Sequence, residues 1–465
     1  MPDANALLPA DPAAIPVWCV DAPAYEALDL PAPARAFARA TGFEPKPGRT
    51  ALLPDAAGGL AGVLLGLDGA GAEHPDPFLL GKLPGLLPSG RYRLAAAPPD
   101  AGLAALAWLL GAYRFTRYRE PGGETPRLVA PDGVDAEAVG RIARAVALGR
   151  DLVNTPANDL GPAEIAEAAV ALAHRHGATA RVIEGEALAD GFPMIHAVGR
   201  ASTRAPRLVD LTWGDEIPGE SGAPRVTLVG KGVAFDTGGL DIKPSSAMLL
   251  MKKDMGGAAA ALACADMIMG AGLPVRLRVL IPTVENAIAG DAFRPGDVLR
   301  SRRGLTVEIG NTDAEGRLIL ADALDLADAE APDLLVDFST LTGAARVALG
   351  PDLPALFTPD DGLAADLQRL GLAVNDPVWR LPLWPPYARM LDSKVADVNH
   401  VSGGPFAGAV TAALFLRRFA TKAKAHVHFD LYAWNPSTRP GRPEGGEVQA
   451  ARLVHALVAE RYGRS

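Results

Sequence analysis

The fold predicted for this chain follows from residues 305–318, which read LTVEIGNTDAEGRL. Residues 305–309 alternate and are β-branched, a pattern that predicts a strand. Residues 318–329 are rich in Ala, Leu and Asp and predict a helix. Asp313 and Glu315 therefore stand between a strand and a helix, at the edge where open α/β sheets place their ligands. Carboxylates concentrated beside an apolar strand need a partner, and a divalent cation is the first candidate.

Length and composition are those of a globular protein with more than one domain. The 465 residues exceed the size of a single comfortable core. Hydrophobic residues make up 49% and charged residues 21%, a balance unlike that of a disordered chain. The formal charge of −9 argues against a chain whose main role is to bind nucleic acid or an anionic membrane.

Cysteine usage and hydropathy predict a cytoplasmic location. Cys19 and Cys264 lie far apart and outside any CxxC or Cys/His cluster, so a reducing compartment fits. Residues 1–11 lack the basic and apolar segments of a signal peptide. No apolar segment reaches the ~20 residues that a membrane span requires. We therefore expect no contact with a membrane.

Two domains are expected from the distribution of elements. Residues 1–130 predict a smaller N-terminal α/β domain without a dense cluster of catalytic residue types. Residues 131–465 predict a larger catalytic domain that opens with a connecting helix at 131–152. Strands and helices then alternate, which predicts an α/β fold with a mixed, largely parallel sheet between helices. The predicted strands are 207–213, 226–229, 275–282, 307–309 and 334–338, and the predicted helices are 163–176, 256–269, 318–329 and 408–420.

One segment of the N-terminal region raises the question of nucleic acid. Residues 113–119, YRFTRYR, interleave aromatic side chains with arginines, as surfaces that stack on single strands do. The interpretation that we favour is the end of a strand whose arginines extend to solvent. Nucleic acid is therefore not an expected partner.

Two further polar clusters precede residues 305–318. Residues 230–244, GKGVAFDTGGLDIKP, follow a predicted strand but lack the GxxxxGK[ST] spacing of a phosphate-binding loop. In residues 251–257, MKKDMGG, the acid could be an ordinary charge at a helix N-terminus. Converging carboxylates repel one another unless cations neutralise them, and two divalent ions would also serve hydrolysis. Spacing alone leaves a two-metal hydrolase and a scatter of surface acids equally open. The carboxylates concerned are Asp236, Asp254, Asp313 and Glu315.

Taken together, the clusters resemble the leucyl aminopeptidase family, the M17 metallopeptidases. The resemblance rests on four motifs in the family's order, and matching segments span about residues 150–419. It implies a metallo-aminopeptidase that releases N-terminal residues from short peptides, assembles as a homo-hexamer and acts in the cytoplasm. The motifs are VGKGVAFDTGGLDIKP at 229–244, MKKDMGGAAA at 251–260, NTDAEGRL at 311–318 and STLTGA at 339–344.

The resemblance implies a set of metal ligands. Asp236 and Glu315 would bridge two divalent ions, which would be Zn²⁺ or Mn²⁺, with Mg²⁺ as a further candidate. Asp313 would complete the ligands of one ion, and Lys231 and Asp254 those of the other. Lys231 would bind as a neutral amine, because two dications lower its pKa. A water or hydroxide between the ions would be the nucleophile, and Asp254 would also receive the α-amine of the substrate.

The resemblance also implies catalytic and substrate-binding residues. Lys243 would stabilise the oxyanion of the tetrahedral intermediate. Arg317 would hold a bicarbonate ion as general base, whereas without the resemblance it reads as a salt bridge to a site carboxylate. Met251, Thr340 and Gly343 would line the pocket for the first side chain of the peptide.

Two segments depart from the family pattern. Residues 426–430, HVHFD, lack the tryptophan expected before their His-x-Asp, and residues 432–446 form an unusual Pro/Gly/Arg-rich ending. Side-chain preference is therefore left open. The alternatives are a dipeptidase of shifted specificity, for instance for cysteinyl-glycine, and a DNA-binding or scaffolding protein in which the peptidase site is incidental. The negative net charge argues against the latter.

Overall fold

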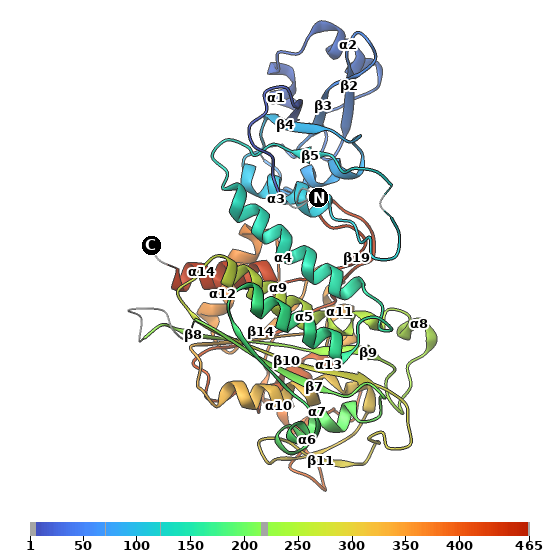
Figure 1. Ribbon diagram of the computed structural model, residues 1–465, viewed down its shortest axis with the longest axis vertical. Helices are drawn as coiled ribbons and strands as arrows, with labels where there is room; N and C mark the ends of the chain where they lie inside the picture. Colours follow the sequence, from blue (N-terminus) through green and yellow to red (C-terminus); the bar gives the residue numbers. More distant parts are fainter. Residues whose placement is uncertain (1–5, 70, 121, 215–221, 464–465) are drawn as a thin grey trace. The chain divides into compact units, whose positions relative to one another are not determined.

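The computed structural model describes residues 6–69, 71–120, 122–214 and 222–463 (Figure 1). Residues 1–5, which open the segment used to exclude a signal peptide, lie outside this description. The chain divides into two compact units, Met1–Ala147 with Ser437–Glu444, and Leu148–Pro436 with Gly445–Ser465. The division falls within helix α4 (Ala136–Asn154). The domain boundary near residue 130 stays a prediction.

The first unit is built on a five-stranded sheet in the order β2-β3-β1-β4-β5, mostly parallel. Helix α3 (Ala101–Gly111) is apolar on all sides and largely buried, and its Trp108 donates a hydrogen bond to the Pro126 carbonyl at 3.3 Å. The other elements are β1 (Ile15–Val20), α1 (Ala22–Ala27), α2 (Ala32–Ala40), β2 (Thr50–Pro54), β3 (Leu60–Gly66), β4 (Arg91–Ala96) and β5 (Arg127–Leu128).

The strand end predicted within residues 113–119 is wrong. These residues follow α3 as irregular backbone and bends. Phe115 and Tyr118 pack edge to face, with ring centroids 5.9 Å apart, and the Arg117 guanidinium lies 5.9 Å from the Tyr118 ring. The aromatic side chains therefore contact one another instead of alternating across a sheet.

The second unit contains a nine-stranded sheet in the order β15-β14-β17-β13-β8-β10-β7-β6, with β9 paired to β10. Its centre is parallel, and β6, β7 and β14 run antiparallel to neighbours. The mixed, largely parallel sheet and four of its predicted strands are confirmed. The strands are β6 (Thr179–Ile183), β7 (Arg207–Trp213), β8 (Arg225–Gly230), β9 (Gly232–Asp236), β10 (Arg276–Asn286), β13 (Leu334–Ser339), β14 (Ala355–Phe357), β15 (Trp379–Arg380) and β17 (His426–Asp430).

Helices cover both faces of this sheet (Figure 1). One face carries α5 (Pro162–Arg175), α9 (Gly256–Gly270), α12 (Asp361–Ala373) and α14 (Ala451–Tyr462), and the other carries α6 (Gly185–Gly191), α7 (Pro193–Gly199), α10 (Gly316–Asp328) and α13 (Gly408–Arg417). Helix α9 is almost wholly buried, and its small residues let it approach the strands closely. A Cβ on Gly257, for example, would lie 2.1 Å from the Phe338 carbonyl oxygen.

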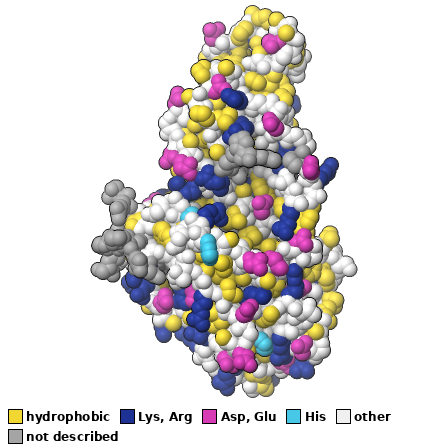
Figure 2. All heavy atoms as spheres, viewed as in Figure 1, with side chains coloured by type: hydrophobic (Ala, Val, Ile, Leu, Met, Phe, Trp, Pro, Cys, Tyr) yellow, Lys and Arg dark blue, Asp and Glu magenta, His cyan; other side chains and the backbone are white. Residues whose placement is uncertain are grey.

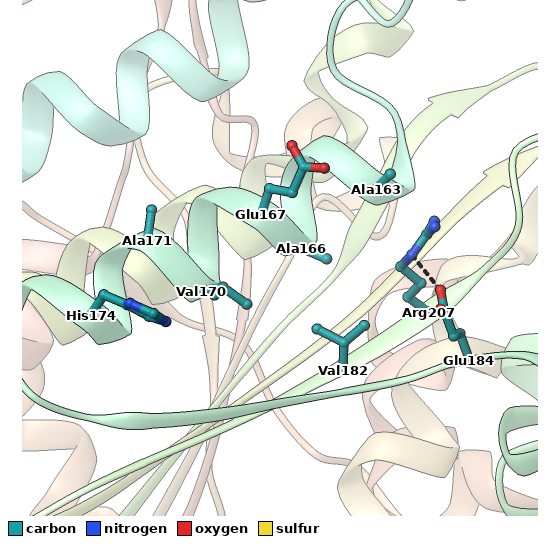
Figure 3. Close-up of a pocket in the computed structure, with 9 residues that line it drawn as sticks. All are labelled: Ala163, Ala166, Glu167, Val170, Ala171, His174, Val182, Glu184 and Arg207. Carbon is teal, nitrogen blue, oxygen red and sulfur yellow. Dashed lines mark ion pairs between the residues drawn. The ribbon is translucent and has the colours of Figure 1, made fainter.

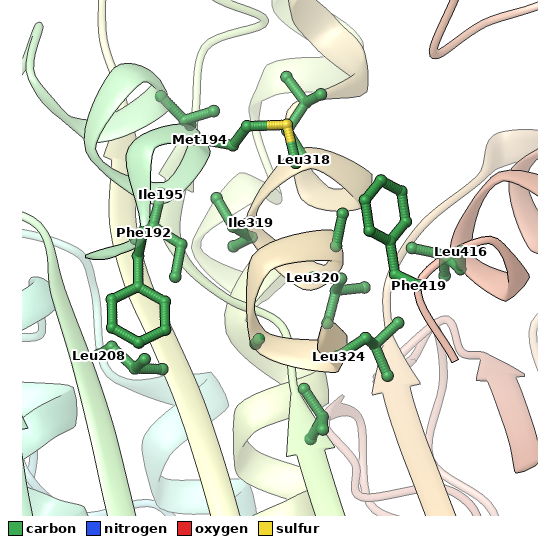
Figure 4. Close-up of a cluster of buried hydrophobic side chains, with 14 of the residues drawn as sticks. Phe192, Met194, Ile195, Leu208, Leu318, Ile319, Leu320, Leu324, Leu416 and Phe419 are labelled. Carbon is green, nitrogen blue, oxygen red and sulfur yellow. The ribbon is translucent and has the colours of Figure 1, made fainter. Parts of the chain in front are cut away.

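Helix α10 is held by apolar contacts within one buried cluster of side chains. Leu318, Ile319 and Leu324 belong to one buried cluster with side chains from α7, α13 and the residues just after α13, among them Met194 and Phe419 (Figure 4). Complete burial of a leucine-sized side chain stabilises the fold by roughly 1.5–3 kcal/mol. The first turn of α10, which follows the two acids of residues 311–318, therefore has a rigid support.

The strand before that motif does not belong to the nine-stranded sheet. Strand β12 (Thr306–Glu308) pairs with β11 (Val298–Arg300) and β16 (Val398–Asn399) in a separate three-stranded sheet. The expectation that it lies in the central sheet is wrong, because alternation predicts a strand but not its partners. Among the described residues, no helix combines the length and apolar character needed to cross a membrane.

Candidate metal centre

The predicted site residues converge at the carboxyl ends of adjacent strands of the central sheet. Lys231 follows β8, Asp236 ends β9, and Thr340 follows β13. The 3₁₀ helix Met251–Met255 brings Asp254 to the same edge, and the 3₁₀ helix Thr312–Ala314 brings in Asp313 from the small sheet. This edge is the usual ligand site of open α/β sheets.

Three carboxylates form the centre of the cluster. One oxygen each from Asp236, Asp313 and Glu315 lies within 4.8 Å of the other two. Burial, followed by repulsion from Asp236, raises the pKa of Asp313 to about 6 and that of Glu315 well above its ordinary value. The cluster therefore favours cations, as the sequence predicts.

Two lysines lie between these carboxylates. Lys231 Nζ is 2.8 Å from Asp254 Oδ2 and 2.9 Å from Glu315 Oε1. Lys243 Nζ is 2.7 Å from Asp236 Oδ2 and also contacts Asp313 Oδ1. Burial alone would lower the pKa of each lysine, but the adjacent carboxylates raise both above the ordinary value.

The donor set fits divalent cations. The oxygens Asp254 Oδ2, Asp313 Oδ1 and Glu315 Oε1 are buried and accept no hydrogen bond from the described residues; lysine ammonium groups are their nearby charges. Carboxylate oxygens are the ligands that hard divalent ions prefer, and a lysine can join them once it has lost its proton. A metal ion would therefore satisfy oxygens that the folded chain leaves without hydrogen bonds.

Asn286 and Thr312 support the cluster, and neither was predicted as a site residue. Asn286, at the end of β10, donates to Asp236 Oδ1 at 2.8 Å and to the Thr312 carbonyl at 3.1 Å. The Thr312 hydroxyl donates to the Gly238 carbonyl at 2.7 Å and accepts from the Asp241 amide at 2.9 Å. These bonds join two segments that are far apart in sequence. The position of Asn286 at a strand end was the available signal.

Gly316 leaves the space that Lys231 occupies. A Cβ at position 316 would lie 2.5 Å from Lys231 Cε and 2.6 Å from its Nζ. Lys231 is held at three points, since it also donates to the Thr340 carbonyl at 3.0 Å, so moving aside would break these contacts. The glycine of NTDAEGRL therefore has a steric role.

Gly316→Ala is expected to displace Lys231 and to weaken metal binding by about 10- to 100-fold, the usual cost of disturbing groups that orient a ligand. Calorimetric titration of the metal-free protein with Mn²⁺ measures this affinity. Gly403→Ala is the matched control, because a Cβ there meets nothing within 4 Å. Unchanged Mn²⁺ affinity in Gly316→Ala would show that Lys231 is not a ligand.

A cavity of about 480 Å³ opens beside the cluster. The predicted pocket residues Met251, Thr340 and Gly343 all line it. Lys253, Arg346 and Tyr432 also line the cavity, although they were not predicted as pocket residues. The remaining wall is formed by Lys231, Asp236, Lys243, Ser246, Ala247, Leu250, Asp254, Asp313, Leu341, Thr342 and Leu431.

Arg317 is placed differently from the prediction. Glu315 has helical backbone angles, and Arg317 lies in the first turn of α10. The Arg317 guanidinium is buried behind the cavity wall and donates to the His400 carbonyl at 2.6 Å. Burial lowers its pKa to about 10. Among the described residues it forms no salt bridge to a site carboxylate.

A second groove, of about 570 Å³, lies between α5 and the strands β6 and β7 (Figure 3). Small and apolar side chains form much of its wall, and Arg207 pairs with Glu184 at 2.8 Å across one end. Four of the five candidate metal ligands line the first cavity, and the buried fifth, Glu315, lies 2.9 Å from Lys231 Nζ.

Comparisons with known proteins agree with this geometry. Residues 147–458 match the sequence profile described as "Cytosol aminopeptidase family, catalytic domain", and residues 25–131 match "M17 aminopeptidase, N-terminal domain". The probable cytosol aminopeptidase of Roseiflexus castenholzii is 41% identical over 379 residues, which cover 78% of this chain and 77% of the relative. That of Caulobacter vibrioides is 38% identical over 422 residues, which cover 86% and 85%.

Solved structures give the same result. The cytosol aminopeptidase from Coxiella burnetii is 46% identical, with a TM-score of 0.92 over 98% of this chain and 99% of that one. The bottromycin maturation enzyme BotP in complex with Mn is 35% identical, with a TM-score of 0.86 over 96% and 99%. The chain therefore belongs to the cytosol aminopeptidase family M17, a family of metallo-aminopeptidases.

Proposed function

We propose that this chain hydrolyses the N-terminal peptide bond of short peptides with two divalent ions held by Lys231, Asp236, Asp254, Asp313 and Glu315. The observation that carries the proposal is the convergence of these side chains, four of which line one cavity while the buried Glu315 lies beside Lys231. Three of their oxygens, Asp254 Oδ2, Asp313 Oδ1 and Glu315 Oε1, accept no hydrogen bond from the described residues but lie beside ammonium groups. When bound, the ions would supply Lewis acidity to the peptide carbonyl and to the attacking water.

The side chains around the ions would orient the substrate. Asp254 would receive the free α-amine, and its carboxylate is already held in place by the Thr340 hydroxyl at 2.7 Å. Lys243 would donate to the oxyanion, because its ammonium lines the cavity and the carboxylates raise its pKa, which keeps it protonated. These roles explain why an exopeptidase needs an acid and a cation on one cavity wall.

For Arg317 we propose the binding of a bicarbonate ion that acts as general base. Its guanidinium gives one N–H to the His400 carbonyl, and its buried Nε donates to no group among the described residues. A planar guanidinium binds a planar oxyanion with good geometry. The nearby Glu315 and Asp430 raise the Arg317 pKa against the effect of burial, so the side chain stays cationic.

Metal identity, assembly and location are proposals of the same kind. The manganese complex of the similar structure supports Mn²⁺, with Zn²⁺ and Mg²⁺ as the other candidates. A homo-hexamer is proposed on the family resemblance. A cytoplasmic location is supported by relatives named cytosol aminopeptidases. On the face shown in Figure 2 basic and acidic side chains are interspersed, which together with the net charge of −9 favours peptides over DNA as the partner.

The decisive test is an assay of aminoacyl amides and dipeptides with Mn²⁺, Zn²⁺ or Mg²⁺. We expect hydrolysis that is lost on chelation, because the carboxylate cluster alone has no nucleophile. Matched N-acetylated peptides are the control and are expected to stay intact, since Asp254 then has no amine to bind. Inactivity with all three metals, or equal cleavage of acetylated peptides, would contradict an aminopeptidase.

A further inference from the structure

Two cationic side chains beside the candidate metal centre lack a carboxylate partner. Lys253 is next to Asp254 and only 5% exposed, and Arg346 lies on helix α11 (Gly343–Leu349). Lys253 Nζ lies 4.8 Å and the Arg346 guanidinium 5.0 Å from the centre of the Tyr432 ring. Among the described residues neither side chain forms an ion pair or a hydrogen bond. All three side chains line the same cavity.

The nearby carboxylates are already occupied. Asp254 binds Lys231 and the Thr340 hydroxyl. Asp430 accepts hydrogen bonds from the Leu341 amide at 3.0 Å and from the Thr342 hydroxyl at 2.6 Å. A cation that burial deprives of water needs a counter-charge. Lys253 is such a buried cation, and among the described residues no hydrogen bond or ion pair supplies its counter-charge. The carboxylate of a ligand would supply it.

The ring between the two cations is held in place by the fold. The amides of Tyr432 and Ala433 donate to Gln449 Oε1 at 3.1 and 3.0 Å, and Gln449 Nε2 donates to the Pro351 carbonyl at 2.8 Å. A Cβ on Gly256 would lie 2.2 Å from Ala433 Cβ, so the start of α9 packs directly against this turn. The cationic end of the cavity is therefore a built surface.

The cavity also contains Met251, Thr340 and Gly343, the residues expected around the first side chain of the peptide. We propose that the enzyme prefers peptides with an N-terminal glutamate or aspartate, whose side-chain carboxylate binds Arg346 and Lys253. This inference rests on the proposed aminopeptidase function. A guanidinium binds a carboxylate through two parallel hydrogen bonds, and a lysine nitrogen can donate a third.

Aminoacyl amides without a terminal carboxylate test the inference directly. We expect kcat/KM for a glutamyl amide to exceed that for the isosteric glutaminyl amide by about 10- to 100-fold, as charged hydrogen bonds predict. Arg346→Met should reduce this ratio by about tenfold or more, and kcat/KM for a leucyl amide is measured beside it. Lys253→Met should likewise reduce the glutamyl-to-glutaminyl ratio.

Controls separate charge from structure. Arg294→Met removes an exposed arginine that pairs with Asp297 and should leave the glutamyl-to-glutaminyl ratio unchanged. Arg346→Glu should reverse the preference, so that lysyl amides are cleaved better than glutamyl amides. Because Lys253 is buried, its replacement could disturb the fold, so metal content and thermal unfolding of Lys253→Met are measured in parallel. Arg346 is exposed, and its variants therefore test the inference independently.

The outcomes distinguish this inference from the function on which it rests. Cleavage of leucyl amides with a glutamyl-to-glutaminyl ratio near one would overturn the acidic preference and leave the aminopeptidase standing. A loss in Arg346→Met that falls on Leu-Gly but not on Leu-Gly amide would assign the cations to the carboxyl terminus of a dipeptide and would also overturn it. Inactivity toward every amide would refute the proposed function itself.

Discussion

Replacing Asp236 or Glu315 by alanine is expected to lower kcat/KM by at least about 1,000-fold, since a metal ion supplies several kcal/mol of transition-state stabilisation. Each variant should also retain fewer than two metal ions per chain. The reason is positional, because Asp236 and Glu315 belong to one carboxylate cluster and each contacts a different lysine. Elemental analysis of the purified protein gives the metal content, and amide hydrolysis gives kcat/KM.

Each alanine variant removes one of the two carboxylates beside a lysine, so the folded state must be checked by circular dichroism. Glu315→Gln and Asp236→Asn keep the volume and serve as gentler variants. Asp392→Ala, at an exposed position, is the matched control and should keep both ions and full activity. Two ions per chain in a folded Asp236→Ala or Glu315→Ala variant would refute the bridging assignment.

Lys243→Met is expected to lower kcat by about 100- to 1,000-fold, the usual effect of losing one oxyanion donor. Metal binding should persist or become tighter, because the ammonium of Lys243 competes with cations for Asp236 and Asp313. The variant thus separates catalysis from metal binding, which the carboxylate variants cannot do.

Steady-state kinetics and Mn²⁺ titration of the same preparation measure the two properties. Lys243→Arg keeps the charge and should recover part of the turnover, limited by the different geometry of a guanidinium. Loss of an ion from Lys243→Met, or turnover equal to that of the unaltered enzyme, would exclude the proposed role at the oxyanion.

Local sequence patterns predicted the central strands and several covering helices because those segments are long and clearly apolar. Strand β7 and helix α9 show this, since the first has the predicted bounds and the second differs by one residue at its end. Strand β17 was missed because His426 and His428 make it look polar. In the fold both histidines bind the buried Asp337, at 2.8 and 2.6 Å, and the strand is buried throughout.

The candidate site was predictable where its residues belong to short sequence motifs. The carboxylates and lysines lie in three short polar segments of the sequence, and their convergence in the fold could be expected from those segments. Asn286 and Tyr432 stand outside those motifs, and only the packing of distant segments brings them to the site. The small sheet that precedes Asp313 could likewise not be predicted from the sequence, because the pairing of β12 with β16 joins residues about 90 positions apart.

The lysines within the carboxylate cluster have a consequence for how the enzyme acquires its ions. Lys231 and Lys243 each lie between two acids, so the chain supplies part of its own counter-charge. A zinc finger has no such internal cations and stays unfolded until metal arrives. This chain is expected to complete its folding without metal. The ions that it carries would then reflect the supply in the cell after synthesis. To bind, they would have to displace the proton of Lys231 and to compete with the Lys243 ammonium for its carboxylates.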